Sequence, residues 1–191
     1  MASRTNVIRH VIARVLFYPT LFWNVLLGRW LSVRNWWDPI DPQVILGARP
    51  FRRDVERLHR EGVVAVVNTC QEYLGPIQEY QRYGIEQLHV PTTDFTPPRL
   101  EDVERAVEFV ERHVHEGEVV YIHCKAGRAR SATVALCWLI KYRGLTPEQA
   151  QVHLERHRPH VQRRLWEREV VRQFVDRLEN PSEAAGCRGG D

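Results

Sequence analysis

The chain has 191 residues, of which 43% are hydrophobic and 27% charged, and its formal net charge is +3 at pH 7. This length predicts one domain with one core, and no repeat or long linker argues for a second domain. The charge is uneven, because residues 1–37 hold five arginines and no acid, whereas residues 38–191 hold 22 basic and 24 acidic residues. Because residues 38–191 are nearly neutral, they do not provide the broad basic face of a nucleic-acid-binding protein.

Residues 1–37 are predicted to be a targeting or membrane-associating segment. Their longest uncharged run, residues 15–28, contains fourteen residues with several aromatic side chains. A bilayer span needs about twenty apolar residues, so this run fits a mitochondrial targeting or interfacial anchoring element better. A secretory signal is the alternative, but no small-residue cleavage site follows the run.

Residues 38–179 predict an α/β domain with a central, mainly parallel sheet of four to five strands flanked by helices. Short apolar runs predict buried strands, and apolar spacings of three and four predict helices between them. The predicted strands are residues 44–46, 63–67, 87–90 and 119–122, and the first three helices are residues 54–60, 77–83 and 100–115.

The C-terminal part of this domain is predicted to be helical. Residues 131–142 are apolar all round and should form a central helix, and Thr146 to Gln149 form a capping box that begins another. A last helix, about residues 165–178, should direct four side chains inward, those of Val170, Val171, Phe174 and Leu178. Residues 180–191, with three glycines and a proline, are predicted to be a disordered tail.

The segment between the fourth strand and the central helix has the features of a phosphate-binding loop with a nucleophile. Its sequence is His123-Cys124-Lys125-Ala126-Gly127-Arg128-Ala129-Arg130-Ser131. A strand that leads through a tight loop to a helix N-terminus directs backbone N–H groups and the helix dipole at one point. Cys124 lies at that point, where a thiol should be largely thiolate near neutral pH. Gly127 permits the loop backbone, Ser131 adds a hydroxyl beside the sulfur, and Arg130 can bind two phosphate oxygens.

A second cysteine and arginine have the same spacing without that context. Cys137 and Arg143 also stand six residues apart, but the residues between them contain no glycine and continue a helical apolar pattern. Cys137 is therefore interpreted as a core residue. The four cysteines, at positions 70, 124, 137 and 187, form no disulfide framework or metal-binding spacing and favour a reducing compartment.

Cleavage of a phosphate monoester also requires a general acid, because an alkoxide is a poor leaving group. Asp94 follows the strand at residues 87–90, at the sheet edge where α/β proteins bind ligands. The alternative role for Asp94 is a turn or helix cap before Pro97 and Pro98. Asp102 is the second candidate acid, although its place in a first helical turn suits the helix dipole. The predicted chemistry needs no metal and no cofactor.

Residues 123–131 resemble the signature His-Cys-x5-Arg-Ser/Thr of the cysteine-dependent protein tyrosine and dual-specificity phosphatases. From about residue 13 to about residue 178 the chain is similar, more closely, to the mitochondrial phosphatidylglycerophosphate phosphatases of that superfamily. The similar stretches are residues 13–20, 40–42, 46–48 and 124–133. This chain has Gln71-Glu72-Tyr73 where that family has Glu-Glu-Tyr, and Ala129 where a serine is usual.

The resemblance implies a dual-specificity phosphatase fold and a general acid about thirty residues before the cysteine, which matches Asp94. It also implies that His123 orients the loop through hydrogen bonds, although an ordinary core histidine fits the position equally well. Glu72 and Tyr73 are expected near the substrate, together with the loop residues from Lys125 to Ala129. The implied substrate is a lipid phosphate, and the implied place is the matrix face of the mitochondrial inner membrane.

The charge of the loop supports an anionic phospholipid substrate. Lys125 and Arg128 add more positive charge beside Arg130 than one phosphate monoester needs, which suggests a second anionic group on the substrate. A basic cluster farther along is interpreted as a solvated face, although its dipeptide Arg158-Pro159 resembles one in dual-specificity phosphatases; its members are Arg156, His157, Arg158, His160, Arg163 and Arg164. A membrane-proximal lipid phosphatase is the first hypothesis, and a phosphoprotein phosphatase is the alternative. A non-enzymatic phosphate-binding adaptor is the third, and the intact catalytic residues argue against it.

Overall fold

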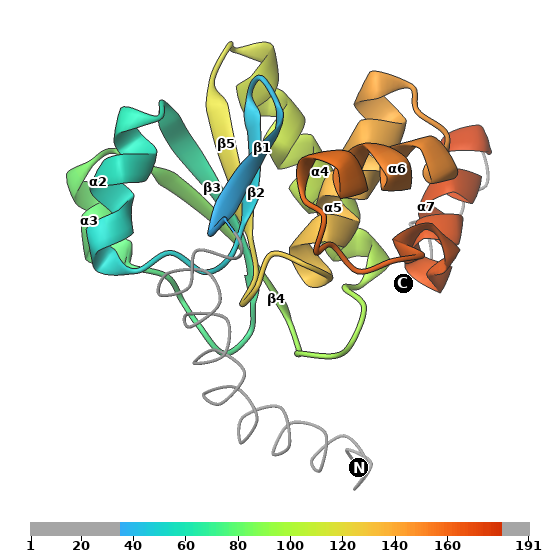
Figure 1. Ribbon diagram of the computed structural model, residues 1–191, viewed down its shortest axis with the longest axis horizontal. Helices are drawn as coiled ribbons and strands as arrows, with labels where there is room; N and C mark the ends of the chain where they lie inside the picture. The colour runs from blue at the N-terminus through green and yellow to red at the C-terminus, as the bar shows by residue number, and fades with distance from the viewer. Residues whose placement is uncertain (1–34, 181–191) are drawn as a thin grey trace, which may run out of the picture.

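The computed structural model describes residues 35–180, and these form the predicted α/β domain (Figure 1). Five strands lie in the order β1-β2-β5-β3-β4, with β1 antiparallel to β2 and every other neighbouring pair parallel. Their bounds are β1 Trp37–Asp41, β2 Val44–Gly47, β3 Val63–Cys70, β4 Glu86–Thr92 and β5 Val119–His123. The predicted tail and nearly all of the predicted N-terminal segment lie outside the described residues.

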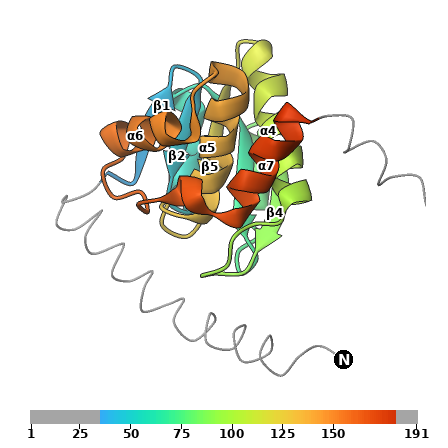
Figure 2. The ribbon, with the colours of Figure 1, turned by 90° about the vertical axis from the view of Figure 1, so that its right-hand side faces the viewer.

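Helices cover both faces of the sheet. Helices α2 (Arg52–Arg60) and α3 (Ile77–Arg82) lie on one face. The other face is covered by α4 (Leu100–His115), α5 (Arg130–Arg143), α6 (Pro147–His157) and α7 (Glu169–Glu179) (Figures 1 and 2). Each face has its own apolar core, because a parallel sheet is buried on both sides. Among residues 35–180, no helix is long and apolar enough to cross a membrane.

Helix α5 lies at the centre of the larger core. Every residue from Arg130 to Leu139 is buried, which confirms the prediction from its apolar sequence. Because the start of α5 is packed on all sides, the end of the loop that precedes it is held in place. The predicted capping box of α6 is also present, since the Gln149 N–H donates to Thr146 Oγ1 at 3.3 Å and the Thr146 N–H donates to Gln149 Oε1 at 3.0 Å.

The sequence does not predict β1, because proline and aspartate are rare in strands. Pro39 is tolerated there because β1 is an edge strand. Trp36 and Trp37 are both buried, and Trp37 Nε1 donates to Glu61 Oε2 at 2.8 Å. The packed domain thus begins before residue 38, the predicted boundary.

The predicted helix at residues 165–178 is wrong in one respect, because the chain breaks within it. A short 3-10 turn, Leu165–Glu167, precedes α7, and Arg168 between them has an extended backbone with ψ 139°. Arg164 adopts a left-handed backbone with φ 60° before the turn. Val170, Val171 and Phe174 are buried as predicted, whereas Leu178 is 36% exposed and does not point inward.

Candidate active site

The loop from His123 to Arg130 lies at the carboxyl edge of the sheet, between β5 and α5. Thr69 Oγ1 on β3 donates to the His123 carbonyl at 3.0 Å and ties the start of the loop to the neighbouring strand. Gly127 has φ +64°, and a Cβ at this position would lie 2.4 Å from the carbonyl carbon of Gly47. Only glycine fits both the backbone angle and the space, as the sequence predicts.

Cys124 is the cysteine of this loop, and its sulfur is surrounded by hydrogen-bond donors. Its Sγ accepts hydrogen bonds from the Gly127 N–H and the Ser131 hydroxyl, each at 3.2 Å. Burial raises the pKa of this thiol, but the charge of Arg130 and the hydrogen bonds from Ser131 and the loop outweigh burial and lower the pKa to about 7. Burial raises the pKa of the other two described cysteines, Cys70 and Cys137, well above the ordinary range. Among the described cysteines, Cys124 is therefore the one that ionises near neutral pH, and Cys137 is a core residue as predicted.

Arg130 is buried beside the sulfur and held in a fixed orientation. Its two terminal nitrogens donate to the Glu72 carboxylate at 3.0 and 2.8 Å, and one of them also donates to the Thr92 carbonyl at 2.8 Å. Burial opposes the charged form, but the hydrogen bonds to Glu72 raise the pKa of Arg130 above its usual value. Glu72 thus acts on the site by orienting Arg130. Arg130 stays positively charged, and its planar guanidinium is suited to bind an oxyanion.

Asp94 faces the loop from the segment after β4. One of its carboxylate oxygens lies 3.1 Å from Arg130 Nη2, and the other pairs with the ammonium group of Lys125. The loop that holds Asp94 is tied to the Glu72 loop, since Thr93 Oγ1 donates to Gln71 Oε1 at 2.7 Å. Asp102, the second candidate acid, instead pairs with Arg105 at 2.9 Å on helix α4. The structure therefore favours Asp94.

Arg158 supports the loop from behind, and the prediction that it lies on a solvated face is wrong. It is 1% exposed and pairs with Asp38. Its Nε donates to the Gly127 carbonyl at 2.8 Å, and its Nη2 donates to the Ala126 carbonyl at 3.1 Å. These bonds give both loop carbonyls a hydrogen-bond donor. Its neighbours Arg156, His157, Arg163 and Arg164 are exposed as predicted.

His123 begins the loop, and the ring of Tyr73 packs against it. Burial lowers the pKa of His123 to about 3, so the ring is neutral, and neither of its ring nitrogens has a hydrogen-bond partner among the described residues. Tyr73 packs edge-on against this ring at 6.3 Å, and its hydroxyl donates to the Pro50 carbonyl at 2.6 Å. A direct contact of Tyr73 with the substrate, and a loop-orienting hydrogen bond from His123, stay predictions.

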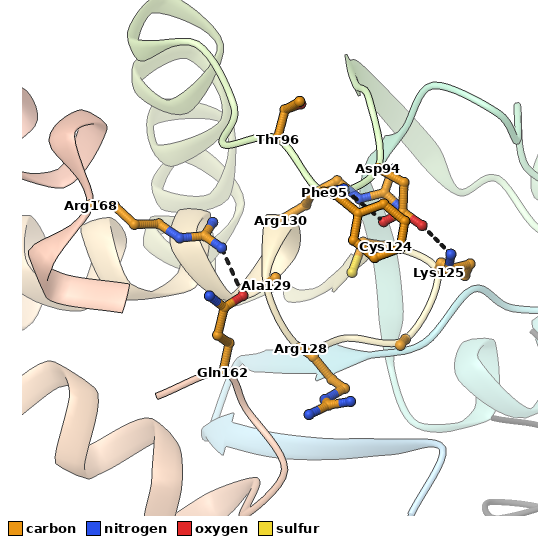
Figure 3. A pocket seen from close by; sticks show the side chains of 11 residues that line it. Asp94, Phe95, Thr96, Cys124, Lys125, Arg128, Ala129, Arg130, Gln162 and Arg168 are labelled. Atoms are coloured by element: carbon orange, nitrogen blue, oxygen red, sulfur yellow. Dashed lines mark hydrogen bonds and ion pairs between the residues drawn. The ribbon is translucent and has the colours of Figure 1, made fainter. Parts of the chain in front are cut away.

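A pocket of about 500 Å³ opens above Cys124 (Figure 3). Most of the predicted site residues meet in it, namely Asp94, Cys124, Lys125, Ala126, Arg128, Ala129 and Arg130. It is completed by Phe95, Thr96, Gln162 and Arg168, which were not predicted from the sequence. A thiolate, a fixed guanidinium and a carboxyl group around one pocket suit nucleophilic displacement at a phosphate ester.

Comparisons with known proteins agree with this geometry. Residues 45–174 match the family model described as dual specificity phosphatase, catalytic domain. The chain is 41% identical over 171 residues to phosphatidylglycerophosphate phosphatase PTPMT2 of Arabidopsis thaliana, a match that covers 88% of this chain and 75% of that protein. It is 36% identical over 181 residues to phosphatidylglycerophosphatase and protein-tyrosine phosphatase 1 of Homo sapiens, and this match covers 90% of each chain.

Solved structures lead to the same family. The crystal structure of PTPMT1 superposes with a TM-score of 0.70 at 32% identity, over 78% of this chain and 99% of that one. A second structure, of PTPMT1 in complex with PI(5)P, gives a TM-score of 0.71 at the same identity. The family match spans the strands, the loop and the helices that build the pocket. The chain therefore belongs to the dual-specificity phosphatases and is a cysteine-dependent phosphoric monoester hydrolase.

Proposed function

We propose that this phosphatase hydrolyses phosphatidylglycerophosphate, releasing inorganic phosphate and leaving phosphatidylglycerol. The observation that supports this substrate most strongly is the similarity, over most of the chain, to relatives named for that activity. The pocket agrees with a polyanionic substrate, because three cationic side chains besides Arg130 line it, those of Lys125, Arg128 and Arg168. A phosphomonoester alone needs fewer positive charges than this pocket offers.

The first chemical step follows from the positions of Cys124, Arg130 and Asp94. The Cys124 thiolate attacks phosphorus, so an S–P bond forms while the bond from phosphorus to the glycerol oxygen breaks. Arg130 and the loop N–H groups stabilise the charge on the remaining phosphate oxygens. Asp94 gives a proton to the departing oxygen, which therefore leaves as an alcohol.

The second step regenerates the enzyme from the cysteinyl-phosphate. Water attacks phosphorus, and Asp94, now a carboxylate, accepts a proton from that water. The S–P bond breaks as the new P–O bond forms, and the sulfur leaves as a thiolate. The Ser131 hydroxyl, 3.2 Å from Sγ, stabilises that thiolate by a hydrogen bond.

A membrane surface is the proposed place of action. Phe95 and Leu74 are 70% and 65% exposed, and they lie on the loops that follow β4 and β3 at the edge of the sheet that holds the pocket. Phe95 also lines the pocket and has a left-handed backbone with φ 64°. Exposed apolar side chains beside a lipid-phosphate site are suited to the interface of a bilayer.

The proposed location is the matrix face of the mitochondrial inner membrane. Its support is the sequence of residues 1–37, which has five arginines, no acid and an aromatic-rich uncharged run, together with the family resemblance. A fusion of residues 1–34 to a fluorescent reporter is expected to enter mitochondria. A diffuse reporter would contradict this location.

A substrate panel tests the proposed activity. Phosphate release is measured from phosphatidylglycerophosphate, a phosphatidylinositol phosphate and a phosphotyrosine peptide, with Cys124→Ser as the inactive control. The highest kcat/KM is expected on phosphatidylglycerophosphate. A higher value on the phosphopeptide would refute the lipid substrate and favour a phosphoprotein phosphatase.

Deletion of residues 1–34 tests whether this segment docks the protein on a membrane surface. The deletion is made there, rather than at residue 37, because Trp36 and Trp37 belong to the buried core. Hydrolysis of a soluble aryl phosphate is expected to be unchanged, whereas activity on lipid in anionic vesicles should fall more than activity on the same lipid in detergent micelles. Equal losses of activity on vesicles and micelles would refute docking by this segment.

A further inference from the structure

Arg168 is a half-buried cation on the wall of the catalytic pocket (Figure 3). It lies beside Gln162, on the side of the pocket away from Asp94 and Phe95. Its guanidinium donates to Thr133 Oγ1 at 2.9 Å and to Gln162 Oε1 at 2.8 Å, and both of these acceptors are neutral. Within residues 35–180, none of the ion pairs of the structure joins Arg168 to a carboxylate.

This arrangement is costly without an anion. Burial lowers the pKa of Arg168, and the negative charge of Cys124 is the one influence that raises it. Arg158 and Arg177, by contrast, pair with the carboxylates of Asp38 and Glu104. A guanidinium has five N–H donors, so the bonds to Thr133 and Gln162 orient Arg168 without saturating it.

Several contacts fix Arg168 relative to the catalytic loop. The Gln162 N–H donates to the Arg128 carbonyl at 2.8 Å, and Arg128 Nε donates to the His160 carbonyl at 2.7 Å. Thr133 lies on α5, the helix that begins at Arg130. Arg168 is thus held by Gln162, which is bonded to the loop, and by Thr133 on the helix that follows the loop. It lies at the break in the chain before α7.

We infer that Arg168, oriented by Thr133 and Gln162, binds a second anionic group of the substrate, the phosphodiester that links the head group to diacylglycerol. This inference rests on the proposed function, because phosphatidylglycerophosphate has a monoester at one end of a glycerol and a phosphodiester at the other. The catalytic loop binds the monoester, and Arg168, an oriented cation without a carboxylate partner, binds the diester on another wall of the same pocket. Arg168 is therefore a specificity-determining residue.

The test compares two substrates that share the reacting end. Dihexanoyl phosphatidylglycerophosphate has the phosphodiester, and glycerol 3-phosphate lacks it. Arg168→Gln is expected to lower kcat/KM about tenfold to a hundredfold on the first substrate, mainly through KM, since a hydrogen bond to a charged group is lost. On glycerol 3-phosphate the change should stay within about twofold. Arg168→Lys should restore part of the loss, because it keeps the charge but not the fork.

Arg172→Gln is the matched control, because it removes the same charge from an exposed position one turn farther along α7. It should leave both substrates unchanged. Equal losses on both substrates in Arg168→Gln would overturn the inference, since Arg168 would then support the loop alone. An unchanged kcat/KM on the diester substrate would also overturn it.

The experiment distinguishes failure of the proposed function from failure of the inference about Arg168. If the unmodified protein does not hydrolyse phosphatidylglycerophosphate, that function is refuted, and the comparison is repeated with dihexanoyl phosphatidylinositol 5-phosphate against inositol 5-phosphate. A selective loss on the lipid in Arg168→Gln would still support a diester site. If the unmodified protein hydrolyses neither lipid, or the losses are equal, the inference is overturned as well.

Discussion

Ser131→Ala removes the hydroxyl that donates to Cys124 Sγ and leaves the backbone of the loop in place. The pKa of Cys124 is lowered from the ordinary value of 9.0 to about 7. The difference between these two pKa values corresponds to about 3 kcal/mol in favour of the thiolate. The Arg130 charge and the loop N–H groups keep their part of this shift in the variant, and a hydrogen bond to a charged group contributes at least about 1.5 kcal/mol, so the loss of the hydroxyl should raise the pKa to about 8.

The sign of the effect on reactivity follows from the thiolate being the nucleophile. A higher pKa leaves less thiolate at any pH below it, so the rate of alkylation at pH 6 should fall about tenfold if the pKa rises from about 7 to about 8. The measurement is the rate of alkylation by iodoacetamide against pH. It is made in a Cys187→Ser background, and Cys70 and Cys137 can stay because burial raises the pKa of both and keeps them as unreactive thiols. The unmodified loop should give a midpoint near 7.

Thr133→Ser is a matched control, since it changes a hydroxyl-bearing residue of the same helix that does not touch the sulfur. It should keep the midpoint of the unmodified protein. An unchanged midpoint in Ser131→Ala would refute this role, because the hydroxyl would then contribute nothing to the thiolate. A midpoint near 9 in the unmodified protein would refute electrostatic stabilisation of the thiolate by the whole loop.

Three further substitutions test the remaining parts of the site. Asp94→Asn should lower kcat by ~10²–10⁴ on an alkyl phosphate and far less on p-nitrophenyl phosphate, whose leaving group needs no proton; equal losses on both would remove Asp94 from the acid role. Arg130→Lys should be nearly as inactive as Arg130→Ala, because both lose the two-point contact; near-normal kcat/KM in the lysine variant would contradict this. Gly127→Ala should lower kcat/KM by about a hundredfold through displacement of the loop. Gly144→Ala, which has φ +64° but open space around it, should cost about 1 kcal/mol of stability and no activity; equal activity losses in the two glycine variants would show that strain alone matters.

The loop was predictable because its information is local. Cys124, Gly127 and Arg130 lie within seven residues, and a single strand-loop-helix unit brings them together. Asp94 was predictable from its place after a strand, because the carboxyl ends of parallel strands share one edge of the sheet. These residues needed no knowledge of the tertiary packing.

Arg158 and Arg168 could not be selected from a sequence that is rich in arginine. Arg158 becomes a support of the loop only when β1 brings Asp38 to it, across 120 positions in the chain. Arg168 enters the pocket at the break before α7, where its own backbone is extended between the 3-10 turn and the helix. The apolar spacing of residues 165–178 predicts one continuous helix, so the sequence pattern does not reveal the break at Arg168.

The proposed mechanism requires that Cys124 becomes phosphorylated during turnover. Phosphatidylglycerophosphate labelled with ³²P in the terminal phosphate is mixed with the enzyme, and the reaction is quenched with acid within milliseconds. We predict a burst of label on the protein that maps by peptide sequencing to Cys124 and is absent in Cys124→Ser. Label on another residue, or full turnover by Cys124→Ser, would contradict the mechanism.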